Sequence, residues 1–154
     1  MRVLSLLVVA GLVTGCIRTS TDPVTGKVDV DVESPTKRGE EWKATLAGTT
    51  IPSITGDATA RVYAGQTQVT ISLLGVPEGE ARPWHIHQGT CGSGGPIVGS
   101  PSAYPPLTVG ADGKATGTAT IPLQLDEAQR YHVNVHASAA EMATIVACGA
   151  LNDE

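Results

Sequence analysis

Residues 115–121 read ATGTATI, and this stretch decides the fold class because small apolar residues alternate with threonines along it. A period of two places the apolar residues on one face of an extended strand and the hydroxyls on the other. The same alternation returns at residues 69–73, VTISL, and at residues 42–46, WKATL. Gly, Pro and Asp separate such segments at intervals of roughly ten residues. The sequence therefore predicts an all-β domain over residues 42–154, built as an antiparallel β-sandwich or barrel.

Composition excludes several classes of protein. The 154 residues suffice for one compact domain and are too few for two large ones. Ten basic and fifteen acidic residues leave a net charge of −5, which argues against a nucleic-acid partner. Aromatic residues make up 3% and phenylalanine is absent, so the core must consist mainly of Val, Ile, Leu and Ala. The abundance of Thr, Val and Gly also argues against a helical bundle.

The N-terminus has the features of an export signal. Residues 1–15 read MRVLSLLVVAGLVTG, an apolar run too short to span a bilayer but typical of a signal peptide. Residues 13–16, VTGC, resemble the lipobox of bacterial lipoproteins, in which the cysteine becomes the lipidated first residue. The resemblance implies a lipid anchor on Cys16 and a place in the cell envelope, or periplasm, at a membrane surface. The alternative is an ordinary secretory signal in which Cys16 is incidental.

Residues 16–41 are polar and rich in Thr, Pro and charged residues. They suit a flexible tether between the lipid and the domain, although residues 27–32 could form a short strand. Removal of residues 1–15 takes away one arginine, so the mature chain carries 9 − 15 = −6.

The remaining cysteines form an even pair if Cys16 is acylated. In an oxidising compartment Cys91 and Cys148 can form a disulfide, which would close a loop of about 58 residues and stabilise the fold by about 4 kcal/mol. The alternatives are two free thiols or two thiolate metal ligands. Cys91 also opens a Gly- and Pro-rich loop, residues 89–106, that has no periodicity and needs bracing from outside.

All four histidines fall in two short segments, WHIH at residues 84–87 and YHVNVH at residues 131–136. On strands, the spacings i,i+2 and i,i+4 place each pair on one face, with Ile86, Val133 and Val135 on the other. Three or four converging imidazoles without thiolate or carboxylate favour copper. The alternative is that the histidines are surface residues or hydrogen-bonded polar groups. The candidate metal ligands are His85, His87, His132 and His136.

Three segments resemble the bacterial periplasmic copper/zinc superoxide dismutases: WHIHQGTCG at residues 84–92, the segment that ends at His136, and ACGAL at residues 147–151. The resemblance implies a Greek-key β-sandwich and a Cys91–Cys148 disulfide. The chain from residue 42 is also similar to the chordin-type (CHRD) domain, through ATLAG at residues 44–48, IP at 51–52, HIH at 85–87 and residues 131–136.

The superoxide dismutase resemblance implies copper ligands at His85, His87 and His136. His132 has no counterpart in that family and is a candidate fourth ligand. Residues 88–107 contain no His or Asp, so the zinc site of the family is expected to be missing. The active-site arginine of the family falls on Ile145. The pattern is that of a copper-only site.

The leading hypothesis is therefore an extracytoplasmic, lipid-anchored copper protein that dismutates superoxide to dioxygen and hydrogen peroxide. A negative chain repels this anionic substrate, so local positive charge must offset the repulsion. Arg82 and Arg130 each lie within three residues of a histidine pair and are the candidates for this role. The alternatives are a copper-binding lipoprotein for storage, tolerance or delivery, and a CHRD-like structural module without metal.

Overall fold

The computed structural model describes residues 17–21, 28–32 and 40–153, and the chain divides into two compact units, residues 1–38 and 39–154. In the first unit, β1 (Ile17–Thr21) pairs with β2 (Val28–Val32) in antiparallel fashion. Strand β2 confirms the strand predicted at residues 27–32, whereas β1 lies where the sequence predicts only a tether. The predicted signal peptide and Cys16 lie outside the described residues. Within the described part of the chain, no helix is long and apolar enough to cross a membrane.

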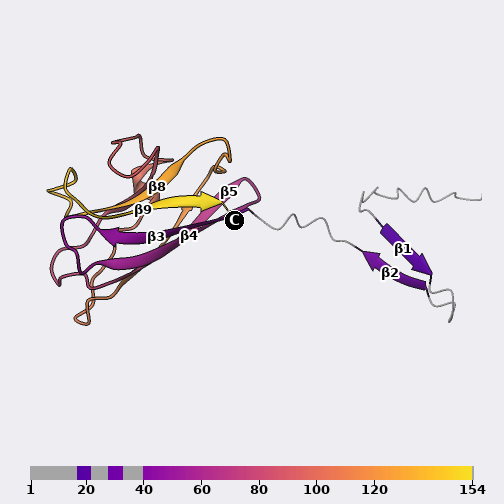
Figure 1. Cartoon of the computed structure of the whole chain (residues 1–154), viewed down its shortest axis with the longest axis horizontal. Coiled ribbons are helices and arrows are strands. Elements are labelled where there is room, and N and C mark those ends of the chain that lie inside the picture. The colour runs from indigo at the N-terminus through magenta and orange to yellow at the C-terminus, as the bar shows by residue number, and fades with distance from the viewer. Residues whose placement is uncertain (1–16, 22–27, 33–39, 154) are drawn as a thin grey trace, which may run out of the picture. The chain divides into compact units, whose positions relative to one another are not determined.

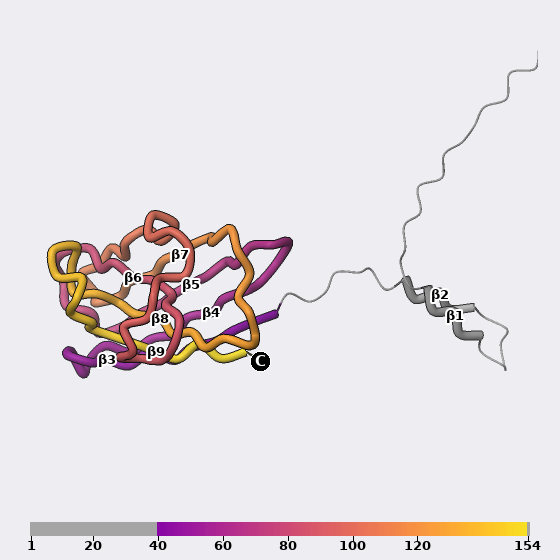
Figure 2. The backbone as a smooth tube through the Cα atoms, turned by 90° about the horizontal axis from the view of Figure 1, so that it is seen from above, coloured from indigo at the N-terminus to yellow at the C-terminus, as the bar shows by residue number. Residues whose placement is uncertain are grey.

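The second unit contains one antiparallel sheet in the spatial order β6-β8-β9-β3-β4-β5-β7. The sheet curls so that its two ends approach each other (Figures 1 and 2), which confirms the predicted all-β, antiparallel sandwich-like fold. A single turn of 3₁₀ helix, Pro101–Ala103, interrupts the long loop after β6. The strands are β3 (Glu41–Gly48), β4 (Thr55–Tyr63), β5 (Gln66–Leu74), β6 (Trp84–Gln88), β7 (Ala115–Ile121), β8 (Tyr131–His136) and β9 (Ile145–Asp153).

The core lies inside the curled sheet and follows the alternation of the sequence. In β5, Val69, Ile71 and Leu73 are fully buried and the residues between them are exposed, as a period of two requires. Trp84 and Leu107 fill the space beside Gly117 of β7. A Cβ at this position would lie 2.5 Å from a Leu107 methyl, so only glycine fits without a shift of its neighbours. The two ends of the sheet therefore pack on each other through a large indole opposite a glycine.

The topology brings the two histidine segments together. Strands β6 and β8 are adjacent and antiparallel, with His85 opposite Asn134 and His87 opposite His132. A register shift between Val135 and His136, where β8 meets β9, turns the end of β8 relative to its partner. His136 extends the pairing through its backbone N–H, which donates to the Pro83 carbonyl at 2.8 Å. Segments 51 residues apart in sequence thus share one face of the sheet.

Candidate metal centre

Strands β6 and β8 present an apolar face to the core and a polar face to the loops above them. Ile86, Val133 and Val135 are fully buried on the apolar side, as the alternation predicts. The polar side is buried as well, with exposed fractions between 0% and 9%. Burial of imidazoles and an amide is unfavourable unless their nitrogens and oxygens have partners. This polar face consists of His85, His87, His132, Asn134 and His136.

Three of the four histidines converge. His85, His87 and His136 each offer one ring nitrogen, and these nitrogens all lie within 4.8 Å of one another. His85 Nδ1 and His136 Nε2 are 3.1 Å apart. Two nitrogens each about 2.0–2.1 Å from one ion are about 2.9–3.6 Å apart at bond angles of about 90–120°. These two nitrogens therefore already have the spacing expected for ligands of one ion, and the His87 nitrogen lies within 4.8 Å of both.

Backbone carbonyls set the tautomers of two of these rings. His87 Nδ1–H donates to the Gly95 carbonyl at 2.8 Å, and His136 Nδ1–H donates to the Met142 carbonyl at 2.6 Å. A carbonyl only accepts, so each Nδ1 carries a proton, and in the neutral form of each ring Nε2 keeps the lone pair. His85 Nδ1–H consequently donates to His136 Nε2. An ion bound by both nitrogens would take the place of this hydrogen bond, and the partners of His87 and His136 would orient those rings as ligands.

Burial lowers the pKa of two of the three rings, His85 and His136. Desolvation lowers the pKa of His85 to about 4, and the neighbouring His136 and His87 contribute further to that lowering. Desolvation also lowers the pKa of His136, although its bond to the Met142 backbone opposes the shift. Metal ions bind only unprotonated imidazole, so the lowered pKa values of His85 and His136 favour metal binding by these two rings at neutral pH.

His132 lies outside the group of three. Its ring stacks on that of His87, with ring centroids 5.5 Å apart and an interplanar angle of 25°. The side chain is fully buried, and neither ring nitrogen makes a hydrogen bond with the described part of the protein. Burial lowers the pKa of His132; the backbone of Gly89 opposes that shift without meeting a ring nitrogen in hydrogen-bond geometry. The structure thus gathers His85, His87 and His136 and leaves His132 beside them.

The loop of residues 89–106 forms one wall of the site. A Cys91–Cys148 disulfide with a Cα–Cα distance of 6.0 Å ties the start of this loop to β9, which confirms the pairing expected from the sequence. Tyr104 packs edge-on against His85, with ring centroids 5.2 Å apart, and its hydroxyl donates to the Val98 carbonyl at 2.6 Å. Burial raises the pKa of that hydroxyl. The bracing that this loop needs comes from a disulfide at its start and a buried tyrosine near its end.

Sequence reasoning missed Tyr104 and the two carbonyls that orient His87 and His136. The carbonyls belong to Gly95 and Met142, and no side-chain pattern identifies a residue that acts through its backbone. Tyr104 was recognisable only as an aromatic residue in a loop with few apolar side chains.

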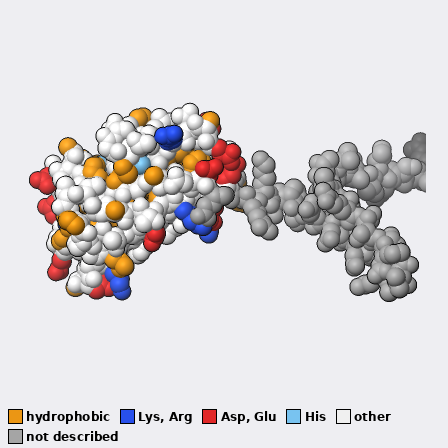
Figure 3. All heavy atoms as spheres, viewed as in Figure 1, with side chains coloured by type: hydrophobic (Ala, Val, Ile, Leu, Met, Phe, Trp, Pro, Cys, Tyr) orange, Lys and Arg blue, Asp and Glu red, His pale blue; other side chains and the backbone are white. Residues whose placement is uncertain are grey.

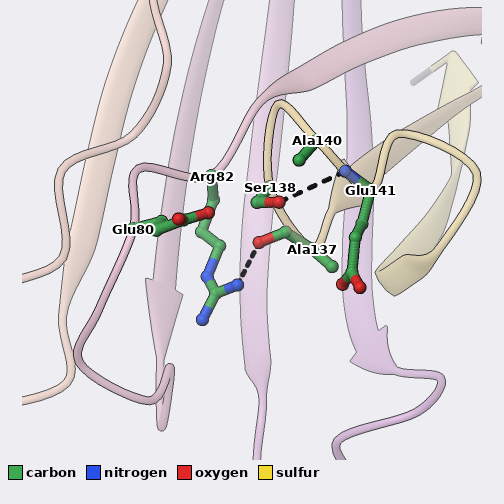
Figure 4. A pocket seen from close by; sticks show the side chains of 6 residues that line it. All are labelled: Glu80, Arg82, Ala137, Ser138, Ala140 and Glu141. Atoms are coloured by element: carbon green, nitrogen blue, oxygen red, sulfur yellow. Dashed lines mark hydrogen bonds between the residues drawn. The ribbon is translucent and has the colours of Figure 1, made fainter.

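Arg82 lies next to the residue that follows His136. Its guanidinium donates to the Ala137 carbonyl and, at 3.4 Å, to the Pro77 carbonyl. It lines a hollow of about 370 Å³ in which the Glu80 and Glu141 carboxylates also lie (Figure 4). Arg82 therefore links the approach to β6 with the end of β8, and it shares the lining of this hollow with two acidic residues.

The remaining positions named from sequence lie at the edge of the site. Arg130 is exposed just before β8, and Ile145 is half-buried opposite His136. On the face shown in Figure 3, a small area of histidine reaches the surface among hydrophobic and uncharged side chains, with a cationic side chain near it in that view. The histidine face is thus close to solvent although each ring is almost entirely buried.

The donor set defines what the centre can hold. Three imidazoles could bind a transition-metal ion, and imidazole suits copper, zinc, iron and nickel alike. The nitrogens meet at a disulfide-braced edge of an antiparallel sheet. A scan against models of protein families and a search of the curated proteins both find no match to this chain.

Proposed function

We propose that this protein is a lipid-anchored, extracytoplasmic copper protein that dismutates superoxide at a copper-only site. The observation that carries the proposal is the meeting of His85, His87 and His136, whose ring nitrogens lie within 4.8 Å of one another. The resemblance of the same segments to bacterial copper/zinc superoxide dismutases supports both the metal and the reaction. The lipobox-like residues 13–16 support the anchor.

The all-nitrogen donor set supports copper over other ions. No carboxylate or thiolate belongs to the group, and both half-cystines next to the site are consumed in the disulfide. When bound there, copper supplies the one-electron chemistry by which two superoxide ions and two protons become dioxygen and hydrogen peroxide. The chain's own part is to present three imidazoles and to hold two of them by the Gly95 and Met142 carbonyls.

A second candidate is a copper-binding lipoprotein without turnover, for storage, tolerance or delivery. Ile145 favours it, because an aliphatic side chain stands where the resembling enzymes carry their active-site arginine. The environment of Arg82 favours it too, since Glu80 and Glu141 line the same hollow and oppose attraction of an anion. Binding and turnover therefore have to be measured separately.

The test loads the purified chain with Cu(II) and measures bound copper per chain and the rate of superoxide decay. We expect one copper ion per chain and decay faster than with the metal-free protein. His87→Gln should weaken copper binding by more than ~10-fold, because loss of a ligand exceeds the effect of losing an outer partner. Gln88→Ala, an exposed change on the same strand, serves as the matched control. Bound copper without decay selects the second candidate, and no bound copper contradicts both.

A further inference from the structure

Outside the group of His85, His87 and His136, the buried imidazole of His132 lacks the partners that a buried polar ring needs. It is fully buried, yet both of its ring nitrogens lack hydrogen-bond partners within the described residues. Each buried polar atom without a partner costs about 1–3 kcal/mol. A phenylalanine-like ring would fill the same space without this penalty, so the two nitrogens need an explanation that packing does not provide.

The neighbours of His132 indicate what the missing partner is. His132 is directly opposite His87 on the paired strands, and the two rings are stacked at 25°. His87 Nε2, the ligand atom of that ring, is likewise buried without a partner. Unpartnered lone pairs on two stacked rings at the edge of a three-nitrogen group point to one positive centre that satisfies both.

The loop that packs against the group supplies no further His or carboxylate donor. Residues 88–107, which cover the site, contain no His, Asp or Glu, and the Tyr104 hydroxyl in that loop is already bonded to Val98. Asn134 shares the polar face with an unpartnered amide oxygen, but copper(II) prefers imidazole nitrogen. His132 is therefore the remaining imidazole that can complete a tetragonal set.

We propose that His132 is the fourth nitrogen ligand of Cu(II) in this protein, and that a change in its side-chain torsions brings it to the ion. This inference rests on the proposed copper site and adds to it a ligand from β8 that the resembling family does not have. The ring starts from a position stacked on His87, one of the three rings of the group.

The test is pulsed EPR of the chain loaded with one equivalent of Cu(II), together with X-ray absorption to count imidazoles around the ion. We expect four coupled nitrogens in the wild type. His132→Phe keeps a planar ring that can stack on His87 but removes both nitrogens, so it should give three. It should also raise the Kd for Cu(II) by ~10-fold or more. Gln88→Ala should leave both the nitrogen count and the Kd unchanged.

Three outcomes separate this inference from the function on which it rests. Bound copper with three nitrogens in the wild type overturns the role of His132 and leaves the copper site standing. An identical spectrum and Kd in His132→Phe overturns it as well. Failure of the wild type to bind copper overturns both proposals. The wild-type nitrogen count decides the question even where His132→Phe does not fold.

Discussion

His85 Nδ1 lies 3.1 Å from His136 Nε2, although 51 residues separate the two histidines. The hydrogen bond between them exists because β6 and β8 are neighbours in the sheet and because the Met142 carbonyl fixes the proton of His136 on the other ring nitrogen. This pair forms the centre of the site and is the contact that a bound ion would replace.

Substitutions at this pair should be non-additive. His85→Gln and His136→Gln should each lower Cu(II) affinity by more than ~10-fold, since either change removes one nitrogen of the shared site. The double variant should bind more weakly than either single variant, but its loss of binding free energy should differ from the sum of the two single losses, because residues that contact one ion are coupled. Isothermal titration of all three variants measures the coupling. Fully additive losses would mean that the two rings contribute independently, against a shared site.

The Cys91–Cys148 disulfide should contribute a large part of the stability of the fold. The two residues are 57 positions apart, and a closed loop of that size stabilises a protein by about 4 kcal/mol in the chain-entropy model. We expect a Cys91→Ala/Cys148→Ala double variant to lose about that amount, measured by denaturant unfolding of the metal-free chain. Reduction of the wild type should reproduce the loss. Equal stability of the oxidised and reduced chains would contradict the prediction.

Gly95→Ala should weaken metal binding through the backbone. A Cβ at Gly95 would lie 1.9 Å from the Gln88 carbonyl oxygen, so the loop must move and take with it the Gly95 carbonyl that orients His87. We expect a 10–100-fold loss of Cu(II) affinity, the range typical of lost outer partners of metal ligands.

The matched control for that change is Gly92→Ala in the same loop. Gly92 has open space around it but a φ of +83°, so alanine should cost about 1–2 kcal/mol of stability through strain alone. Its Cu(II) affinity should stay near the wild-type value. Equal losses of affinity in both variants would mean that general loosening of the loop, rather than the Gly95 carbonyl, controls the site.

The metal-free protein should lose stability as the pH falls from about 6.5 towards 4. The pKa of folded His85 is about 4 against an ordinary value of 6.5, so protons bind preferentially to the unfolded chain in this window. The lowered pKa values of His132 and His136 act in the same direction. Denaturant unfolding across this range measures the slope, and His85→Gln should reduce it. A stability that is flat between these pH values would contradict the burial argument.

Arg130→Ala should slow superoxide turnover if Arg130 attracts the substrate. The side chain is exposed immediately before β8, and steering by surface charge changes association rates by ~10-fold or more. We expect a loss near the lower end of that range at low ionic strength and a flatter dependence on salt. Arg61→Ala on β4 removes the same charge from a side chain paired with Glu41 and is the control. An unchanged rate at low salt would rule out the steering role.

Most of the fold could be predicted from local patterns. Alternation along residues 42–46, 69–73 and 115–121 identified strands and their buried faces, because the side-chain period of a strand is a property of each segment alone. The same rule placed His85 with His87, and His132 with His136, on common faces. The even pair of cysteines indicated the disulfide.

Which histidines meet was decided by the tertiary structure. Adjacency of β6 and β8, the irregularity between Val135 and His136 and the two orienting carbonyls depend on contacts between distant segments, and no local pattern encodes them. Two histidines on the same face of β8 therefore have different positions: His136 belongs to the group of three, whereas His132 stacks on His87 beside it. Spacing along a chain specifies the direction of a side chain, whereas convergence on one point requires the relative placement of whole strands.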